Sequence, residues 1–177
     1  MGIVHGTLNW ILDWHRRNGH SLDEILNPAI PKELVSNKLK DIGCDCEELS
    51  SIFEWRNGTR SNHNLTLGEV WIIPGYYLLP LESCIEIRNI NLRVGHWNPQ
   101  WLPFLFDECD GTYAYSCAPG QVGQILHEME GTQEVIFPNL ESALESWKLH
   151  FEKGAYEVKN GRLAFNRTIL QSLETNE

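Results

Sequence analysis

One stretch of aromatic and acidic residues constrains the fold of this chain more than any other. Residues 96–121 contain two Trp, two Phe, two Tyr and three acidic residues, but no Lys or Arg. The runs 103–106 (PFLF) and 112–117 (TYAYSC) have the composition of strands. Asp and Gly in the DECDG segment between them tolerate the backbone angles of a tight reversal. The sequence therefore predicts a β-hairpin that begins near Trp97 and Trp101.

This hairpin is expected to belong to one domain that spans residues 1–177. The chain is 42% hydrophobic and has seven Trp, which is enough to build a core without disulfides or metal. The N-terminus has no signal-peptide pattern, and the longest apolar run, YYLLPL, is far shorter than the roughly 20 residues of a membrane span. We therefore expect a cytoplasmic protein that has no contact with a membrane. Its five cysteines are odd in number and show no paired spacing, so we expect reduced thiols.

Hydrophobic periodicity and capping signals divide the rest of the chain into helices and strands. Helices are expected over residues 4–17, 21–26, 31–42, 45–57, 81–92, 140–153 and from 167 onward, with capping boxes at Ser21 and Asp45 and an N-cap at Asn139. Further strands are expected over residues 69–73, 76–79, 122–129 and 134–137, and in a hairpin with an Asn160-Gly161 turn. This order of elements predicts an α+β fold.

The distribution of charge is more informative than its total. The formal net charge is −10, which argues against a nucleic-acid partner. Residues 95–147 contain no Lys or Arg but eight acids: Asp107, Glu108, Asp110, Glu128, Glu130, Glu134, Glu141 and Glu145. Two interpretations remain open, namely a solvated surface that keeps the protein in solution and a face that attracts a basic partner.

No complete catalytic or metal-binding motif is present. The chain lacks GxGxxG, GxxxxGK[ST], HExxH and GxSxG patterns. The Cys-Asp-Cys run at 44–46 has no second cysteine pair, which favours ordinary thiols over a zinc site. A nucleophile at Cys109 or Cys117 would need His96 or His127 beside it, and sequence does not show such proximity. The acids of the predicted turn are typical of solvated residues. We therefore expect no enzymatic activity, no cofactor and no metal.

Tryptophan positions suggest either core or interface. Trp71 and Trp147 lie on apolar stripes and are expected in the core. Trp97 and Trp101 flank an Asn-Pro-Gln turn, and Trp55 precedes an Asn-Gly pair. These three residues can either fill the core or anchor an interface, where Trp is enriched among the residues that dominate binding energy.

Several weak motifs follow one another along the chain: CEELSSIFEWRNG at 46–58, the Trp97-to-Phe104 segment with Asp110-Gly111-x-Tyr113 at the reversal, APGQVG at 118–123, FPNLESALESW at 137–147 and the 151–156 segment. Taken in this order, they resemble the SUKH superfamily, which includes a fungal cell-wall-synthesis regulator and many bacterial immunity proteins that neutralise secreted toxins. The resemblance covers residues 20–175. One departure is Ser116, which stands near a position where many members carry an acid.

The resemblance implies a mixed, mostly antiparallel sheet backed by helices, and no catalytic activity. We therefore expect a non-enzymatic protein of the immunity type that binds a basic toxin domain. Its expected partner-binding residues, including exposed aromatic side chains, are Trp55, Trp97, Trp101, Asp107, Glu108, Asp110, Tyr113 and Tyr115. The alternatives are a regulatory scaffold that binds signalling proteins, and a hydrolase with His96, Asp110 and Cys117 around one pocket.

Overall fold

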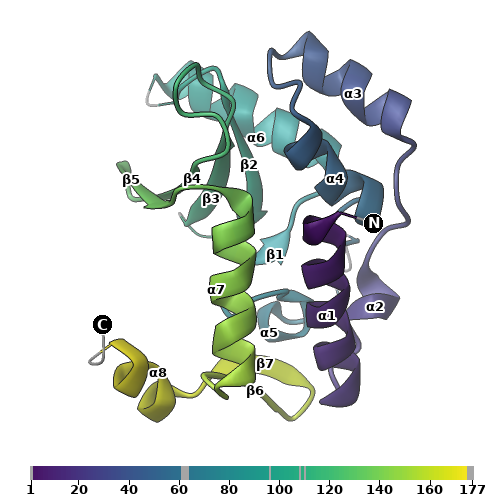
Figure 1. Ribbon diagram of the computed structural model, residues 1–177, viewed down its shortest axis with the longest axis vertical. Helices are drawn as coiled ribbons and strands as arrows, with labels where there is room; N and C mark the ends of the chain where they lie inside the picture. The colour runs from purple at the N-terminus through teal and green to yellow at the C-terminus, as the bar shows by residue number, and fades with distance from the viewer. Residues whose placement is uncertain (1, 61–63, 96, 108, 110, 175–177) are drawn as a thin grey trace.

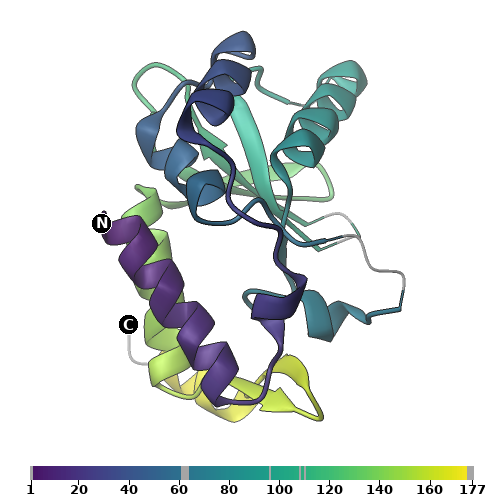
Figure 2. The same ribbon diagram turned by 90° about the vertical axis from the view of Figure 1, so that its right-hand side faces the viewer.

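The computed structural model describes residues 2–60, 64–95, 97–107, 109 and 111–174 (Figures 1 and 2). The helices are α1 (Ile3–Arg17), α2 (Leu22–Ile25), α3 (Lys32–Asp41), α4 (Glu47–Trp55), α5 (Leu67–Val70), α6 (Leu81–Val94), α7 (Leu140–Glu152) and α8 (Arg167–Glu174). The strands are β1 (Tyr77–Leu78), β2 (Trp101–Phe106), β3 (Thr112–Ser116), β4 (Ile125–Met129), β5 (Thr132–Phe137), β6 (Tyr156–Lys159) and β7 (Arg162–Phe165). The predicted α+β class is confirmed.

The predicted central hairpin is formed by β2 and β3. It lies in a five-stranded sheet of order β1-β2-β3-β4-β5, in which each described pairing is antiparallel. The register of β2 on β3 shifts between Pro103 and Leu105, where Pro103 has no N–H to donate. The N–H groups of Cys109 and Gly111 donate to Asp107 Oδ1 (2.8 and 2.9 Å), so the Asp107 side chain holds the reversal.

Helices cover both faces of the sheet. Helices α1 and α7 run side by side (Figure 2), and the Trp147 ring of α7 contacts Tyr113 and Phe137 of the sheet (centroids 5.7 and 6.0 Å). Helix α6 packs on β2 from behind the sheet (Figure 1). Trp147 is buried, as predicted, whereas Trp71 is only half-buried against the core. A continuous apolar core therefore joins the helices to the sheet.

The segment before β1 differs from its predicted structure. The predicted strand at 69–73 is wrong, because α5 occupies part of it and the following residues form a loop. The Thr66 N–H and hydroxyl both donate to Glu69 Oε2 (2.7 and 2.6 Å), which fixes the start of α5. An apolar run alone does not distinguish a short strand from a buried loop.

The two predicted capping boxes are also wrong. Ser21 makes no side-chain cap bond, and α4 begins after Cys46 without one. The Asp45 carboxylate is used elsewhere: it accepts a hydrogen bond from Ser36 (3.0 Å) and pairs with Lys40 (3.7 Å). A cap pattern in sequence therefore competes with tertiary partners.

The local signals near the C-terminus are confirmed. Asn139 caps α7 by accepting a hydrogen bond from the Ser142 N–H (2.8 Å). Asn160 and Gly161 both have positive φ (54° and 76°) and join β6 to β7 as a tight turn. Among the described residues, no helix combines the length and apolar character needed to cross a membrane.

Candidate functional site

The outer edge of β5 is exposed. Strand β5 ends the five-stranded sheet, and no other strand in the described part of the chain pairs with its outer side. Residues 132–136 are all exposed, including Val135 (46%) and Ile136 (39%). Figure 1 shows β5 at the margin of the molecule, next to the start of α7. An exposed apolar strand at the edge of a sheet can pair with another chain.

The turn that leads into β5 also carries exposed residues. Glu130 (φ 51°) and Gly131 (φ 80°) form a two-residue turn between β4 and β5, and Glu128 Oε1 accepts the Gly131 N–H (2.9 Å). Met129, just before the turn, is 43% exposed. The sequence signal for this turn was the Glu-Gly pair between two strand-like runs. We call Met129, Glu130, Glu134, Val135 and Ile136 the β5 edge.

Acidic residues from three elements gather beside this edge. Burial lowers the pKa of His127 on β4, and the negative charges of Asp107, Glu128 and Glu134 act in the opposite direction. These carboxylates come from the β2–β3 turn, β4 and β5, yet all lie within electrostatic range of one imidazole. Three carboxylates of the acidic run therefore lie near one imidazole, although Glu128 and His127, as consecutive residues of β4, point to opposite faces of the sheet. Glu108 and Asp110, two of the predicted binding residues, lie outside the described residues.

Aromatic side chains support the base of the β4–β5 hairpin. The Tyr76 hydroxyl is hydrogen-bonded to His127 Nε2 (2.6 Å), and the Tyr113 ring lies 4.7 Å from both the Tyr76 and His127 rings. Burial, followed by the nearby Tyr113 and Asp107, raises the pKa of Tyr76, so its hydroxyl keeps its proton. The imidazole, with its lowered pKa, is neutral. This cluster holds β4 in place beneath the acidic residues.

A groove lies between α6 and the β4–β5 turn. Its volume is about 650 Å³, and it is lined by Ile87, Ile90, Asn91, Phe106, Cys109, Thr112, Glu128, Glu130 and Gly131. Ile90 is 43% exposed. Apolar walls with carboxylates among the lining suit a Lys or Arg side chain, because its stem packs on apolar atoms and its charge meets an acid. The groove and the β5 edge share Glu130 and form one surface.

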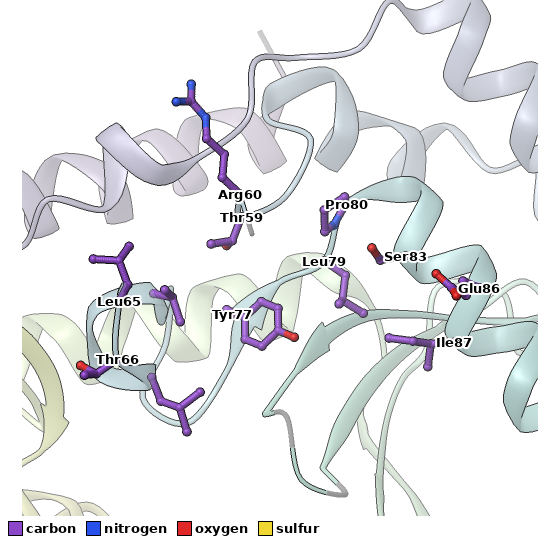
Figure 3. A pocket seen from close by; sticks show the side chains of 12 residues that line it. Thr59, Arg60, Leu65, Thr66, Tyr77, Leu79, Pro80, Ser83, Glu86 and Ile87 are labelled. Atoms are coloured by element: carbon purple, nitrogen blue, oxygen red, sulfur yellow. The ribbon is translucent and has the colours of Figure 1, made fainter. Parts of the chain in front are cut away.

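A second cavity lies on another side of the molecule, between α5, β1 and α6 (Figure 3). It has a volume of about 420 Å³. The side chains of Tyr77, Ser83 and Glu86 lie along it, whereas the Arg60 side chain points away (Figure 3). The described residues that line it include no His and no Cys, so they provide no imidazole base or thiol nucleophile.

Two of the tryptophans predicted to bind a partner lie away from the acidic residues. Trp97 and Trp101 lie at the opposite end of the β2–β3 hairpin from Asp107, with their rings 5.7 Å apart. The Trp97 Nε1–H donates to the Trp101 carbonyl (3.0 Å). Trp97 is 9% exposed and Trp101 is half-buried, so of the two alternatives, core and interface, the burial of Trp97 favours the core. The pair holds the start of β2 in place.

Two other predicted binding residues are also buried. Tyr115 is 1% exposed, and its hydroxyl donates to Glu48 Oε2 (2.8 Å) on α4, so its predicted exposure is wrong. Trp55 is 5% exposed and donates from Nε1 to Asn9 Oδ1 (2.7 Å). Tyr113 and Tyr115 lie on the same face of β3, and Tyr115 is buried because its part of the strand contacts α4, which is distant in sequence. Tyr113, by contrast, is half-buried beside the acidic cluster.

The hydrolase alternative involves two residues, His96 and Asp110, that lie outside the described residues. The third, Cys117, is adjacent to the thiol of Cys44. Within the described ranges, no group of three or more His, Cys, Asp or Glu residues is arranged to hold a metal ion.

No protein-family model matches the chain, and no curated protein is significantly similar to it. Membership of the SUKH superfamily therefore stays a prediction based on the sequence motifs.

Proposed function

We propose that this chain is a non-enzymatic binding protein of the immunity type, which acts in the cytoplasm on a toxin domain with a basic surface. One observation carries the proposal. The unpaired, apolar β5 edge lies within a segment, residues 95–147, that has eight acids and no Lys or Arg. A basic protein complements this surface in both charge and backbone hydrogen bonding.

The proposed mode of binding is strand addition to β5. A partner segment paired with the edge would satisfy the outer backbone groups of β5, and its side chains would cover Val135 and Ile136. A Lys or Arg of the partner would enter the groove beside Glu128 and Glu130. The apolar contacts would determine how long the complex lasts, and the carboxylates would raise the association rate.

The resemblance to SUKH immunity proteins supports a toxin as the partner. A nuclease toxin has a positive surface because its substrate is negatively charged. An acidic protein that covers this surface would block access of the nucleic acid without any catalysis. The cluster of Asp107, Glu128 and Glu134 around His127 provides such negative charge.

Co-expression tests this proposal. The full-length chain is expressed with the toxin encoded by the adjacent reading frame, and growth and co-purification are measured. We expect growth to be restored and the two proteins to purify as a complex. Failure of both with every neighbouring toxin would contradict the proposal.

Two matched valine substitutions test whether the β5 edge is the binding surface. Val135→Lys adds a positive charge to the β5 edge, and Val122→Lys adds the same charge to an exposed valine (57%) in the β3–β4 loop. We expect Val135→Lys to weaken the complex by about tenfold or more and Val122→Lys to have little effect. Equal effects of the two variants would exclude β5 as the binding edge.

A further inference from the structure

Two cysteines that are distant in the sequence lie next to each other. Cys44 lies between α3 and α4, and Cys117 directly follows β3; their thiols are hydrogen-bonded. A second contact aligns the same segments, because Cys46 Sγ lies 2.9 Å from the Tyr115 hydroxyl. Cys46 therefore faces Tyr115, and two residues away in each segment Cys44 faces Cys117. This alignment places the two sulfur atoms together.

A buried arginine lies beside the two thiols. Arg88 of α6 is 8% exposed, and its guanidinium donates to the carbonyls of Pro99 (2.8 Å from Nε) and Ile42 (3.2 Å) and to Asn89 Oδ1 (3.0 Å). Each of its hydrogen-bond acceptors among the described residues is neutral. The positive charge is therefore uncompensated by these acceptors, and it favours a nearby thiolate.

The two thiols differ in acidity and access. The hydrogen bond from Cys117 lowers the pKa of Cys44, and the Arg88 charge acts in the same direction, while burial opposes both. The same hydrogen bond and burial raise the pKa of Cys117. After the first ionisation the remaining proton therefore stays on Cys117, which donates it to the Cys44 thiolate. Cys44 is buried and Cys117 is partly exposed, so solvent reaches the pair through Cys117.

We propose that Cys44 and Cys117 form a reversible redox site that hydrogen peroxide converts to a disulfide and a dithiol reductant restores. After loss of one proton, Cys44 is the thiolate and its sulfur attacks peroxide, while Cys117 keeps its proton. A sulfur–oxygen bond forms, the oxygen–oxygen bond breaks and hydroxide leaves, so Cys44 becomes a sulfenic acid. The hydroxide and the proton lost at the start combine as water.

The second step closes the disulfide. The Cys117 sulfur attacks the Cys44 sulfur, the sulfur–sulfur bond forms, and the sulfur–oxygen bond breaks. The departing hydroxide takes the Cys117 proton and leaves as a second water. Two thiols and one peroxide thus give one disulfide and two waters. In the reverse direction, the reductant's two thiols supply two electrons and become a disulfide.

The site is tested on the purified full-length protein. The reduced protein is treated with hydrogen peroxide, its remaining thiols are blocked with N-ethylmaleimide, and intact and peptide masses are measured. We expect the loss of two reactive thiols, a mass lower by two hydrogen atoms before blocking, and a cross-linked peptide that joins Cys44 to Cys117. Dithiothreitol should restore both thiols.

Three variants distinguish this pair from its neighbours. Cys117→Ser and Cys44→Ala should each abolish the cross-link, whereas Cys46→Ser should retain it. Because Cys44 is buried and its replacement can disturb folding, circular dichroism accompanies the measurement, and the partly exposed Cys117→Ser is the deciding variant. Five reactive thiols after peroxide, or a cross-link through Cys46 or Cys109, would overturn the proposal.

Discussion

Gly58 lies where the chain after α4 contacts the segment around Asn27 and the segment before α6, and no side chain would fit at this position. Its φ is +68°, and an added Cβ would collide with backbone atoms of Leu79 and Pro80. Its carbonyl accepts the Asn27 N–H (2.8 Å), and Asn57 Oδ1 accepts the Leu81 N–H (2.9 Å) at the start of α6. The Asn-Gly pair, which in sequence only ends a helix, is therefore a tertiary junction.

We expect Gly58→Ala to lower the free energy of unfolding by about 3 kcal/mol or more, because backbone strain and a backbone collision add. Gly43→Ala is the matched control. Gly43 has nearly the same φ (+72°) but open space around its Cα, so strain alone should cost about 1 kcal/mol. Urea unfolding measures both. Equal losses would show that the contact with Leu79 and Pro80 is unimportant.

Two buried histidines form a continuous chain of contacts. His15 Nε2 lies 2.9 Å from the Ile72 carbonyl, the two Nδ1 atoms of His15 and His20 lie 2.9 Å apart, and His20 Nε2 lies 3.1 Å from the Gly68 carbonyl. Two neutral imidazoles carry only two N–H hydrogens for these three contacts. A third hydrogen would bring a buried positive charge. Burial and the neighbouring His20 lower the pKa of His15 to about 3, and burial also lowers that of His20.

This pair predicts a loss of stability in mild acid. In the unfolded chain these histidines bind protons below pH about 6.5, whereas in the folded protein both bind them only at lower pH, His15 with a pKa of about 3. Stability is therefore complete above pH 6.5 and falls toward pH 3, by about 1.4 kcal/mol per pH unit for each histidine that stays neutral. Urea unfolding between pH 7.5 and 5.5 should show this loss. His15→Gln should reduce it, and an unchanged pH dependence would contradict the explanation.

At the scale of elements, local signals correctly predicted several turns and one cap, although the capping boxes predicted at Ser21 and Asp45 do not form. The hairpin turn at Asp107, the cap at Asn139 and the Asn160-Gly161 turn all depend on contacts within a few residues. The 69–73 segment was predicted wrongly as a strand because its apolar residues lie in a buried loop after α5. Tyr115 was mispredicted because its burial depends on α4, which is distant in sequence.

The candidate site was predicted only in part for the same reason. The acidic composition is visible in the sequence, but the gathering of Asp107, Glu128 and Glu134 around His127 depends on strand order. The exposure of Val135 and Ile136 depends on the absence of a sixth neighbouring strand in the described sheet, which no local pattern encodes.

Helix α7 offers a test of one element. Its N-cap, Asn139, lies two residues after the end of β5 and accepts the Ser142 N–H. We expect Asn139→Ala to cost about 1 kcal/mol of stability, because the first turn loses its acceptor. Asn139→Ser should retain most of it, since the serine hydroxyl can accept the same bond. Thermal unfolding followed by circular dichroism compares the two, and equal losses would contradict a capping role.

At the scale of the whole molecule, charge is segregated along the chain. All 14 Lys and Arg residues lie in residues 1–94 or 148–177, and none lies in the segment that forms the central hairpin and the β5 edge. The net charge of −10 is therefore unevenly distributed. This asymmetry would orient an approaching basic partner toward the sheet.

We expect the association rate with the co-purified toxin to fall by about tenfold or more as salt rises from about 50 to about 500 mM, because screening weakens steering. Dissociation should change much less. Val135→Ala is the control, since it removes apolar contact without changing charge, and it should speed dissociation while keeping the salt dependence of association. An association rate that does not change with salt concentration would contradict electrostatic steering. Stopped-flow mixing measures both rates.

The exposed β5 edge also has a consequence for the protein by itself. A free apolar strand can pair with the same strand of a second copy and so start aggregation. Two copies that met edge to edge would bring Glu130 and Glu134 of each chain together, with no Lys or Arg nearby in the sequence to neutralise them. The carboxylates that would attract a basic partner would thus also oppose pairing between two copies, so one arrangement of charge would both favour the proposed partner and disfavour self-association.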